Sequence, residues 1–264
     1  MRRLFVMVAS LVVLIAGCGS GGTSSSTSPT AGDAGASTDP LTGSLTVFAA
    51  ASLTEAFNDT KTALQSAHPG LSITYSFAGS QTLVTQIQNG APADVIATAD
   101  QATMQKLVDA ALVTAPVTFA RNKLEIVVAP NNPKGIAGLA DLARGDLNVV
   151  IADSSVPAGK YGKQALQTAG VTVHPVSHPL DVKAALTAVE EGNADAGIVY
   201  VTDVTAAGAK VSGVTIPDAQ NVVASYPIAV VRASHNSATA QGFVDAITGS
   251  AGRRALQARG FLAP

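Results

Sequence analysis

The chain has 264 residues, a formal net charge of −2, 47% hydrophobic residues, 13% charged residues and 4% aromatic residues, with no Trp. That length accommodates one large domain or two of ordinary size, and the hydrophobic content excludes wholesale disorder. The weak, balanced charge excludes the basic footprint of a nucleic-acid-binding protein, and the shortage of aromatic rings disfavours sites that stack sugars or bases.

The beginning of the chain has the composition of a targeting segment. Two arginines precede an apolar run over 4–16, which is shorter than the roughly 20 residues that a membrane-spanning helix needs. The run ends in LIAGC, and Cys18 is the only cysteine, which excludes an intrachain disulfide. This pattern resembles the lipobox of bacterial lipoproteins, so we expect a signal peptide over 1–18 and a lipid anchor on Cys18; the alternative is a chance cysteine beside an ordinary cleavage site. Gly, Ser, Thr and Ala dominate 19–43, which predicts a flexible tether.

From residue 44 onward, strand and helix patterns alternate. The predicted strands are 45–50, 71–78, 94–99, 124–129, 147–152, 196–201, 211–216 and 226–231. The predicted helices are 52–67, 80–89, 101–111, 157–169, 181–191, 241–247 and 252–258. This alternation predicts an α/β fold with parallel sheets and crossover helices. We expect two lobes, with 44–122 and 224–264 forming lobe I and 123–223 forming lobe II.

Small polar residues stand where several of these strands end and helices begin, which is where open α/β sheets bind ligands. Ser52 lies three residues before Glu55, which predicts a capping box, and Gly79 followed by Ser80 predicts a tight turn into the next helix. Helix N-termini have unpaired N–H groups and therefore attract anions. Each of these motifs taken alone is also consistent with a simple helix cap.

Three further positions extend this set of hydrogen-bond donors. Pro157 suits a first helical position, which leaves the amide of Ala158 unpaired, and Asp181 as an N-cap exposes the amide of Val182. Tyr200 ends a strand, either as a donor to a ligand or as a buried tyrosine with a structural partner. None of the donor positions carries a positive charge. The sequence therefore predicts a cleft lined by neutral donors and suited to an anion.

Several segments resemble the molybdate-binding protein of bacterial ABC importers: VFAAASL at 47–53, SFAGS at 76–80, GAPADV at 90–95, VPAG at 156–159, DV at 181–182, GIVY at 197–200 and YPIAVV at 226–231. The resemblance covers about 45–263 and implies a two-lobed type II periplasmic-binding-protein fold with the oxyanion in the cleft between the lobes. It implies contacts from the hydroxyl and amide groups of Ser52 and Ser80, the amides of Ala158 and Val182, and the hydroxyl of Tyr200. The family often has two serines after Phe-Ala, whereas here Gly79 precedes Ser80 and Gln81 follows it.

The resemblance also implies a function. We expect an extracytoplasmic, lipid-anchored monomer that binds molybdenum as molybdate, binds tungstate likewise, uses no cofactor, and delivers the oxyanion by lobe closure to the permease and ATPase of an ABC importer. The alternatives are a receptor for another tetrahedral oxyanion such as sulfate, or an exported hydrolase. The sequence has no Gly-x-Ser-x-Gly elbow and no His-Glu-x-x-His motif, so we expect no enzymatic activity and no nucleic-acid partner.

Overall fold

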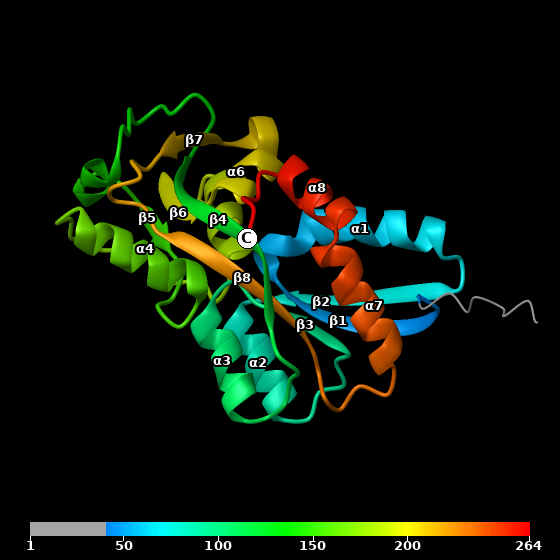
Figure 1. Cartoon of the computed structure of the whole chain (residues 1–264). Helices are drawn as coiled ribbons and strands as arrows, with labels where there is room; N and C mark the ends of the chain where they lie inside the picture. The colour runs from blue at the N-terminus through cyan, green and yellow to red at the C-terminus, as the bar shows by residue number, and fades with distance from the viewer. Residues whose placement is uncertain (1–40) are drawn as a thin grey trace, which may run out of the picture. The chain divides into compact units, whose positions relative to one another are not determined.

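The computed structural model describes residues 41–264, in which helices pack on both faces of a mixed β-sheet (Figure 1). The predicted signal peptide, the lipidation site Cys18 and most of the predicted tether lie outside the described residues. The strands are β1 (Gly43–Ala50), β2 (Leu71–Ala78), β3 (Val95–Ala97), β4 (Val117–Val128), β5 (Val149–Ile151), β6 (Ala196–Tyr200), β7 (Ser212–Thr215) and β8 (Val223–Val230). The helices are α1 (Thr54–Ala67), α2 (Ser80–Gln88), α3 (Gln101–Asp109), α4 (Pro157–Thr168), α5 (Val182–Glu190), α6 (Val201–Ala207), α7 (Ser237–Thr248) and α8 (Ser250–Ala258). Across 41–264, no helix combines the length and apolar character that crossing a membrane requires.

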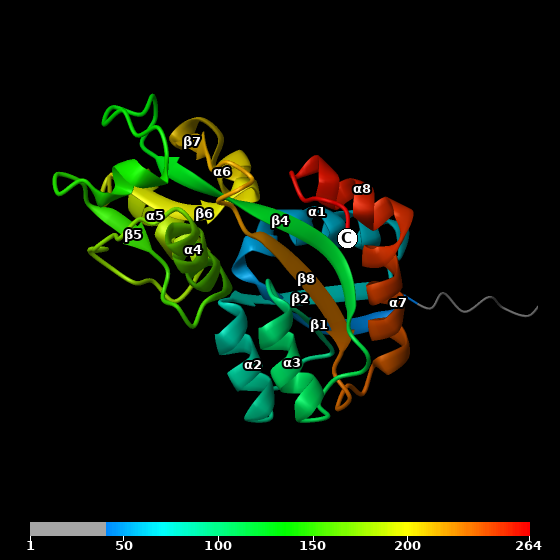
Figure 2. The ribbon, with the colours of Figure 1, turned by 60° about the vertical axis from the view of Figure 1, so that its left-hand side comes forward.

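The strands follow the order β2-β1-β3-β8-β4-β6-β5, and β7 also pairs with β4. Strand β1 is parallel to β2 and β3, and β5 is parallel to β6. The expected parallel pairing is confirmed for these strands only, because β8 is antiparallel to β3 and β4, and β4 is antiparallel to β6 and β7. The long strands β4 and β8 run beside each other in opposite directions through the middle of the sheet (Figure 2).

Strand β4 changes partners along its length. Its first part, up to Lys123, pairs with β8, and the part from Leu124 onward pairs with β6 and β7. We call β2, β1, β3, β8 and the first part of β4 the first half-sheet, and β5, β6, β7 and the rest of β4 the second half-sheet. The predicted strand over 124–129 covers only the second part of β4. Asn122 is fully buried, and its amide donates to Thr202 Oγ1 at 2.8 Å.

Alternating side chains place the first half-sheet between two groups of helices. Phe48 and Ile96 pack with the apolar residues of α2 and α3, whereas Val47 and Ala49 belong to the core shared with α1, α7 and α8. This alternation is the expected period of two for a strand that is buried on both faces. The packing fixes the carboxyl ends of β1 and β2, where the first two predicted donor sites lie.

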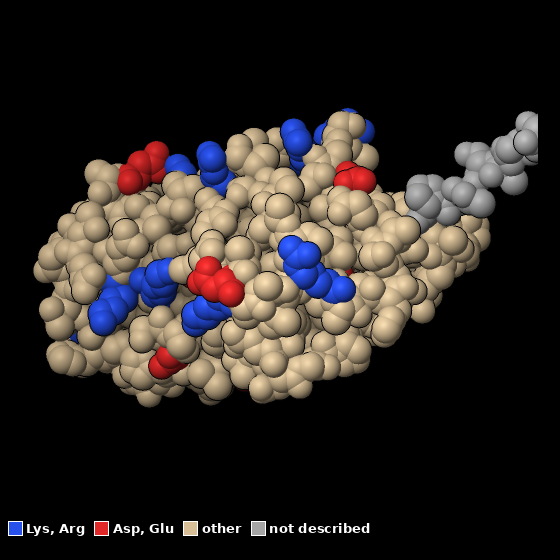
Figure 3. Space-filling model, turned by 60° about the horizontal axis from the view of Figure 1, so that its bottom comes forward, with Lys and Arg blue, Asp and Glu red and all other residues tan. Residues whose placement is uncertain are grey.

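Charged side chains are sparse on the face of the molecule shown in Figure 3, where Lys and Arg are interspersed with Asp and Glu among neutral residues. This distribution agrees with the 13% content of charged residues. A nucleic-acid-binding surface would gather cations of one sign along a continuous stripe. The face in this view has no such stripe.

Candidate anion-binding site

A small pocket lies between the two half-sheets. It is lined by Ala50, Ala51, Ser52, Ala78, Gly79, Ser80, Ala99, Val156, Pro157, Ala158, Val182 and Tyr200. All five predicted donor residues are in this set, each is at most 4% exposed, and none of the lining residues is charged.

Ser52 enters the pocket from a short 3₁₀ helix between β1 and α1. Its Oγ lies 2.9 Å from the Oη of Tyr226, and both residues are buried. The predicted capping box is wrong, because Glu55 makes an ion pair with Lys183 and neither helix N-cap has a side-chain bond. Because a 3₁₀ turn precedes α1, the N-cap of α1 is Leu53 and its first residue is Thr54. Ser52 and Glu55 therefore do not occupy the N-cap and third helical positions that a capping box requires.

Ser80 is the first residue of α2, and Gly79 rather than Ser80 occupies the N-cap position. The Oγ of Ser80 accepts a hydrogen bond from the Ala99 amide at 3.0 Å. Gly79 approaches the second half of the molecule closely, since a Cβ at this position would lie 2.3 Å from the Leu180 carbonyl oxygen. Gln81 spans the same gap and donates from Nε2 to that carbonyl at 2.9 Å. The Gly-Ser-Gln variation in this loop therefore provides a close contact between the two sides of the pocket.

The helices α4 and α5 contribute backbone amides. The predicted start of α4 is confirmed, with Pro157 in the first turn and Ala158 after it. The N-cap role of Asp181 is also confirmed, because its Oδ1 accepts from the Ala184 amide at 2.8 Å. That bond directs the carboxylate to its own helix. The first-turn amides of Ala158 and Val182 have no acceptor within their helices and are available to a ligand.

Tyr200 completes the pocket at the end of β6. It is 1% exposed, and among residues 41–264 its hydroxyl makes no hydrogen bond of good geometry, although the Tyr226 hydroxyl lies near it. Burial raises the pKa of Tyr200 well above its ordinary value, so the hydroxyl keeps its proton. A buried hydroxyl without a partner is costly unless a ligand satisfies it. Of the two alternatives for Tyr200, this arrangement favours the donor to a ligand.

Comparison with known proteins gives the family. Residues 45–262 match the family described as bacterial extracellular solute-binding protein. The chain belongs to this family. The molybdate-binding protein ModA of Mycobacterium tuberculosis is 41% identical over 259 residues, which cover 97% of this chain and 95% of the relative. ModA of Escherichia coli is 38% identical over 232 residues, or 83% of this chain and 89% of the relative.

The same fold occurs in the periplasmic molybdate-binding protein of Azotobacter vinelandii, with a TM-score of 0.73 and 22% identity over 83% of this chain and 99% of that one. The fold of this solute-binding protein is therefore the expected two-lobed type II periplasmic-binding-protein fold. Its family comprises extracellular binding proteins and not enzymes, so the hydrolase alternative is wrong.

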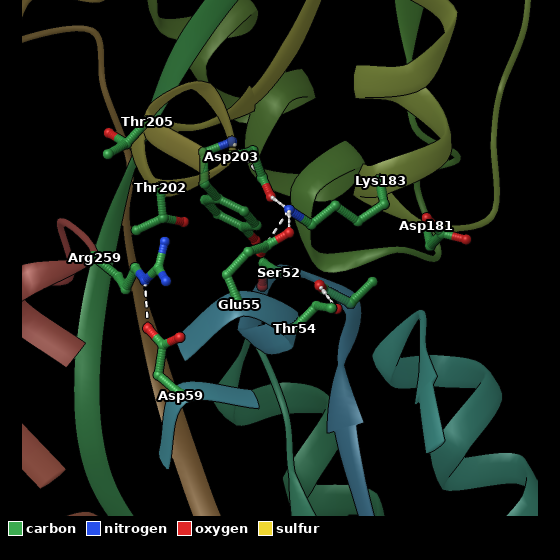
Figure 4. A network of polar contacts seen from close by, with 12 residues as sticks. Ser52, Thr54, Glu55, Asp59, Asp181, Lys183, Thr202, Asp203, Thr205 and Arg259 are labelled. Atoms are coloured by element: carbon green, nitrogen blue, oxygen red, sulfur yellow. Dashed lines mark hydrogen bonds and ion pairs between the residues drawn. The ribbon is translucent and has the colours of Figure 1, made fainter. Parts of the chain in front are cut away.

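A charged network lies beside the pocket of this binding protein (Figure 4). Lys183 Nζ lies 2.8 Å from Glu55 Oε2 and 3.1 Å from Asp203 Oδ1, and it thereby joins α1 to α5 and α6. Asp203 is fully buried and accepts from the Tyr200 amide at 3.1 Å. Burial raises the pKa of Asp203, while the charge of Lys183 lowers it. Because these residues are far apart in the chain, no local sequence signal predicts the network.

Lys160 and Asp100 form a second ion pair between the two sides of the pocket, with 3.2 Å between Nζ and Oδ2. Asp100 is 2% exposed and also caps α3 by accepting from the Thr103 amide at 2.7 Å. Lys160 and Lys183, on the two helices whose first turns line the pocket, are therefore both paired with carboxylates. Within the described part of the chain, no three His, Cys, Asp or Glu side chains are grouped as a metal cation requires. The chemistry available in the pocket is hydrogen-bond donation to an anion.

Proposed function

We propose that this protein binds molybdate, and tungstate likewise, in the pocket between the half-sheets and delivers it to the permease and ATPase of an ABC importer. The observation that carries the proposal is the convergence of five buried, uncharged donor residues from both sides of one small pocket. The names of the relatives that are 41% and 38% identical support molybdate as the ligand.

The donor set suits an oxyanion without a proton. Molybdate at neutral pH is a fully deprotonated dianion, so each of its oxygens accepts hydrogen bonds. The proposed contacts are the hydroxyls and amides of Ser52 and Ser80, the amides of Ala158 and Val182, and the hydroxyl of Tyr200. Phosphate retains a proton near pH 7, and in this pocket that proton meets another donor. Such a mismatch costs about 1–3 kcal/mol, or roughly a tenfold to hundredfold loss of affinity.

Calorimetry with molybdate, tungstate, sulfate and phosphate tests the ligand. We expect molybdate and tungstate to bind alike and phosphate to bind much more weakly. Ser52→Ala and Ser80→Ala should each weaken molybdate binding by about 1.5–3 kcal/mol, the range for hydrogen bonds to charged groups. Ser66→Ala, on the exposed side of α1, is the matched control. Comparable phosphate and molybdate affinities, or near-wild-type affinity in both pocket variants, would contradict the proposal, and a preference for sulfate would make the protein a sulfate receptor.

We further propose that lobe I comprises 44–122 and 224–264, that lobe II comprises 123–223, and that ligand binding closes them. The change of partners of β4 near Lys123, opposite Val223 of β8, supports these boundaries. Closure is needed because the donors on the two sides must reach one small ion. Small-angle scattering should show a smaller radius of gyration with molybdate than without it, and an unchanged value would argue against the hinge.

We also propose that the signal peptide ends at Cys18, that a lipid on Cys18 anchors the protein to the outer face of the cell membrane, and that 19–43 is a tether for a monomeric binding unit. The LIAGC motif and the Gly- and Ser-rich segment support this arrangement. Fractionation of cells that express the full chain is the test. Cys18→Ser should move the protein from the membrane to the soluble fraction, and an unchanged distribution would exclude the anchor.

A further inference from the structure

Tyr226, on β8, contacts the site without lining the pocket. It is fully buried, and its Oη lies 2.9 Å from Ser52 Oγ. Its ring is held edge-on against Tyr200 at a centroid distance of 5.9 Å and against Phe261 at 5.4 Å. The hydroxyl is therefore fixed directly behind one of the proposed ligand contacts.

The direction of the hydrogen bond between Tyr226 and Ser52 follows from the chemistry of the two groups. Burial strongly raises the pKa of Tyr226, so its hydroxyl keeps its proton and remains a donor. A phenol is more acidic than an aliphatic alcohol and is the better donor of the two. The nearby Asn122 side chain already donates to Thr202 Oγ1 at 2.8 Å and accepts from the Lys123 amide at 2.9 Å. The Tyr200 hydroxyl also lies near the Tyr226 hydroxyl, but Ser52 Oγ is the acceptor at 2.9 Å, and we take the Tyr226 hydrogen to be directed to it.

Ser80, the second serine of the pocket, also has a hydrogen-bond partner behind its hydroxyl, and here the donor is certain. The Ala99 amide donates to Ser80 Oγ at 3.0 Å, and an amide N–H can only donate. The Ser80 hydroxyl therefore receives one hydrogen from the protein and has its own hydrogen to give to a ligand. A bond from Tyr226 to Ser52 makes the two serines equivalent, since each has an internal donor behind it.

We propose that Tyr226 is a positioning residue that donates to Ser52 Oγ, turns the Ser52 hydrogen into the pocket and thereby makes the site select fully deprotonated oxyanions. The inference rests on the proposed oxyanion function and adds the residue that sets its selectivity. Without the Tyr226 hydroxyl, Ser52 is free to rotate and to accept the proton of an oxyanion such as hydrogen phosphate. The affinity for a proton-free dianion should then fall, and a protonated oxyanion should compete with it more effectively.

Calorimetry on Tyr226→Phe, alone and combined with Ser52→Ala, tests this role. Tyr226→Phe should weaken molybdate binding about tenfold when Ser52 is present and less than about twofold when it is alanine, because the tyrosine acts through the serine. In competition with molybdate, phosphate should become about tenfold more effective. An equal loss in both backgrounds, or no gain in phosphate competition, would overturn the inference. If the wild-type protein itself does not bind molybdate, the proposed function fails instead.

Tyr75→Phe is the matched control, because Tyr75 belongs to the same aromatic core and donates to the Phe57 carbonyl at 3.0 Å, away from the pocket. It should leave both affinities unchanged. A neutron structure of the wild-type complex with molybdate gives a readout that does not depend on any variant folding. Deuterium on Tyr226 Oη pointing to Ser52 is expected, and deuterium on Ser52 Oγ pointing to Tyr226 would refute the assignment.

Discussion

Replacing Lys183 by methionine removes the one cation shared by Glu55 and the buried Asp203. In the variant, the fully buried Asp203 loses its contact with Nζ at 3.1 Å and retains the Tyr200 amide, also at 3.1 Å. Breaking a buried ion pair by removing one partner costs about 3–5 kcal/mol, because the remaining charge is left uncompensated. The Glu55 side chain is 34% exposed, so its part of the loss is small. We expect the free energy of unfolding to fall by about 3–5 kcal/mol at neutral pH.

The pH dependence of this loss has a definite sign. Burial raises the pKa of Asp203, and loss of Lys183, which lowers it, raises the pKa further. A carboxyl with a raised pKa in the folded state binds its proton more readily than in the unfolded chain, so stability falls as the pH rises from the ordinary pKa through the raised one. The difference between the wild-type protein and the variant should therefore be smaller at about pH 5 than at pH 7.

Guanidinium denaturation at both pH values measures these differences. Lys123→Met is the control, since its partner Asp218 is 81% exposed and the pair should contribute less than about 1 kcal/mol. A loss below about 1 kcal/mol for the Lys183 variant, or a loss that increases towards acid pH, would refute the account of Asp203 as a buried charge that depends on this lysine.

Three further substitutions test the pocket and its closure. In Gly159→Ala, a Cβ lies 2.1 Å from two backbone carbonyl oxygens, so the start of α4 must shift and molybdate affinity should fall more than about tenfold, whereas Gly162→Ala, whose nearest contact is 3.4 Å, should bind normally in calorimetry. Gln81→Ala removes the hydrogen bond to the Leu180 carbonyl and should make closure of the two sides less favourable by about 1 kcal/mol. Small-angle scattering should then show a larger radius of gyration for the ligand-free variant than for the ligand-free wild-type protein. Tyr200→Phe should weaken molybdate binding in calorimetry by about 1.5–3 kcal/mol, the range for a hydrogen bond to a charged group.

Local patterns predict those elements whose burial alternates regularly. Strand β2 has the predicted bounds, and α4 begins at the predicted Pro157. The first part of β4 is missed because its polar residues are paired by partners about a hundred positions away, such as Val223 opposite Lys123. Helix α6 is missed because its sequence VTDVTAA is rich in β-branched residues and is stabilised by tertiary contacts, including the Asp203 ion pair.

The candidate site was predicted to the extent that it depends on where strands end. The five donors follow strand ends or begin helices, and one pocket contains them all. The internal partners of these donors were not predictable in the same way. Tyr226 and Ala99 reach Ser52 and Ser80 from other strands and loops, so only the folded arrangement reveals them. The capping box failed for a related reason, since a 3₁₀ turn changes the spacing without a clear sequence signal.

The absence of charge from the pocket lining also bears on how one oxyanion is distinguished from another. A lysine or arginine in a buried pocket attracts any anion, whatever its protonation state, because Coulomb attraction depends mainly on distance. A neutral N–H or O–H bond depends on orientation and requires a lone pair at a defined position. In this protein Lys183 and Lys160 are paired with carboxylates, the Ala99 amide donates to Ser80 Oγ, and the Tyr226 hydroxyl lies 2.9 Å from Ser52 Oγ. If the proposed donors hold the ligand, selectivity for a proton-free oxyanion depends on the orientation of these donors, and we infer that residues outside the pocket lining set that orientation.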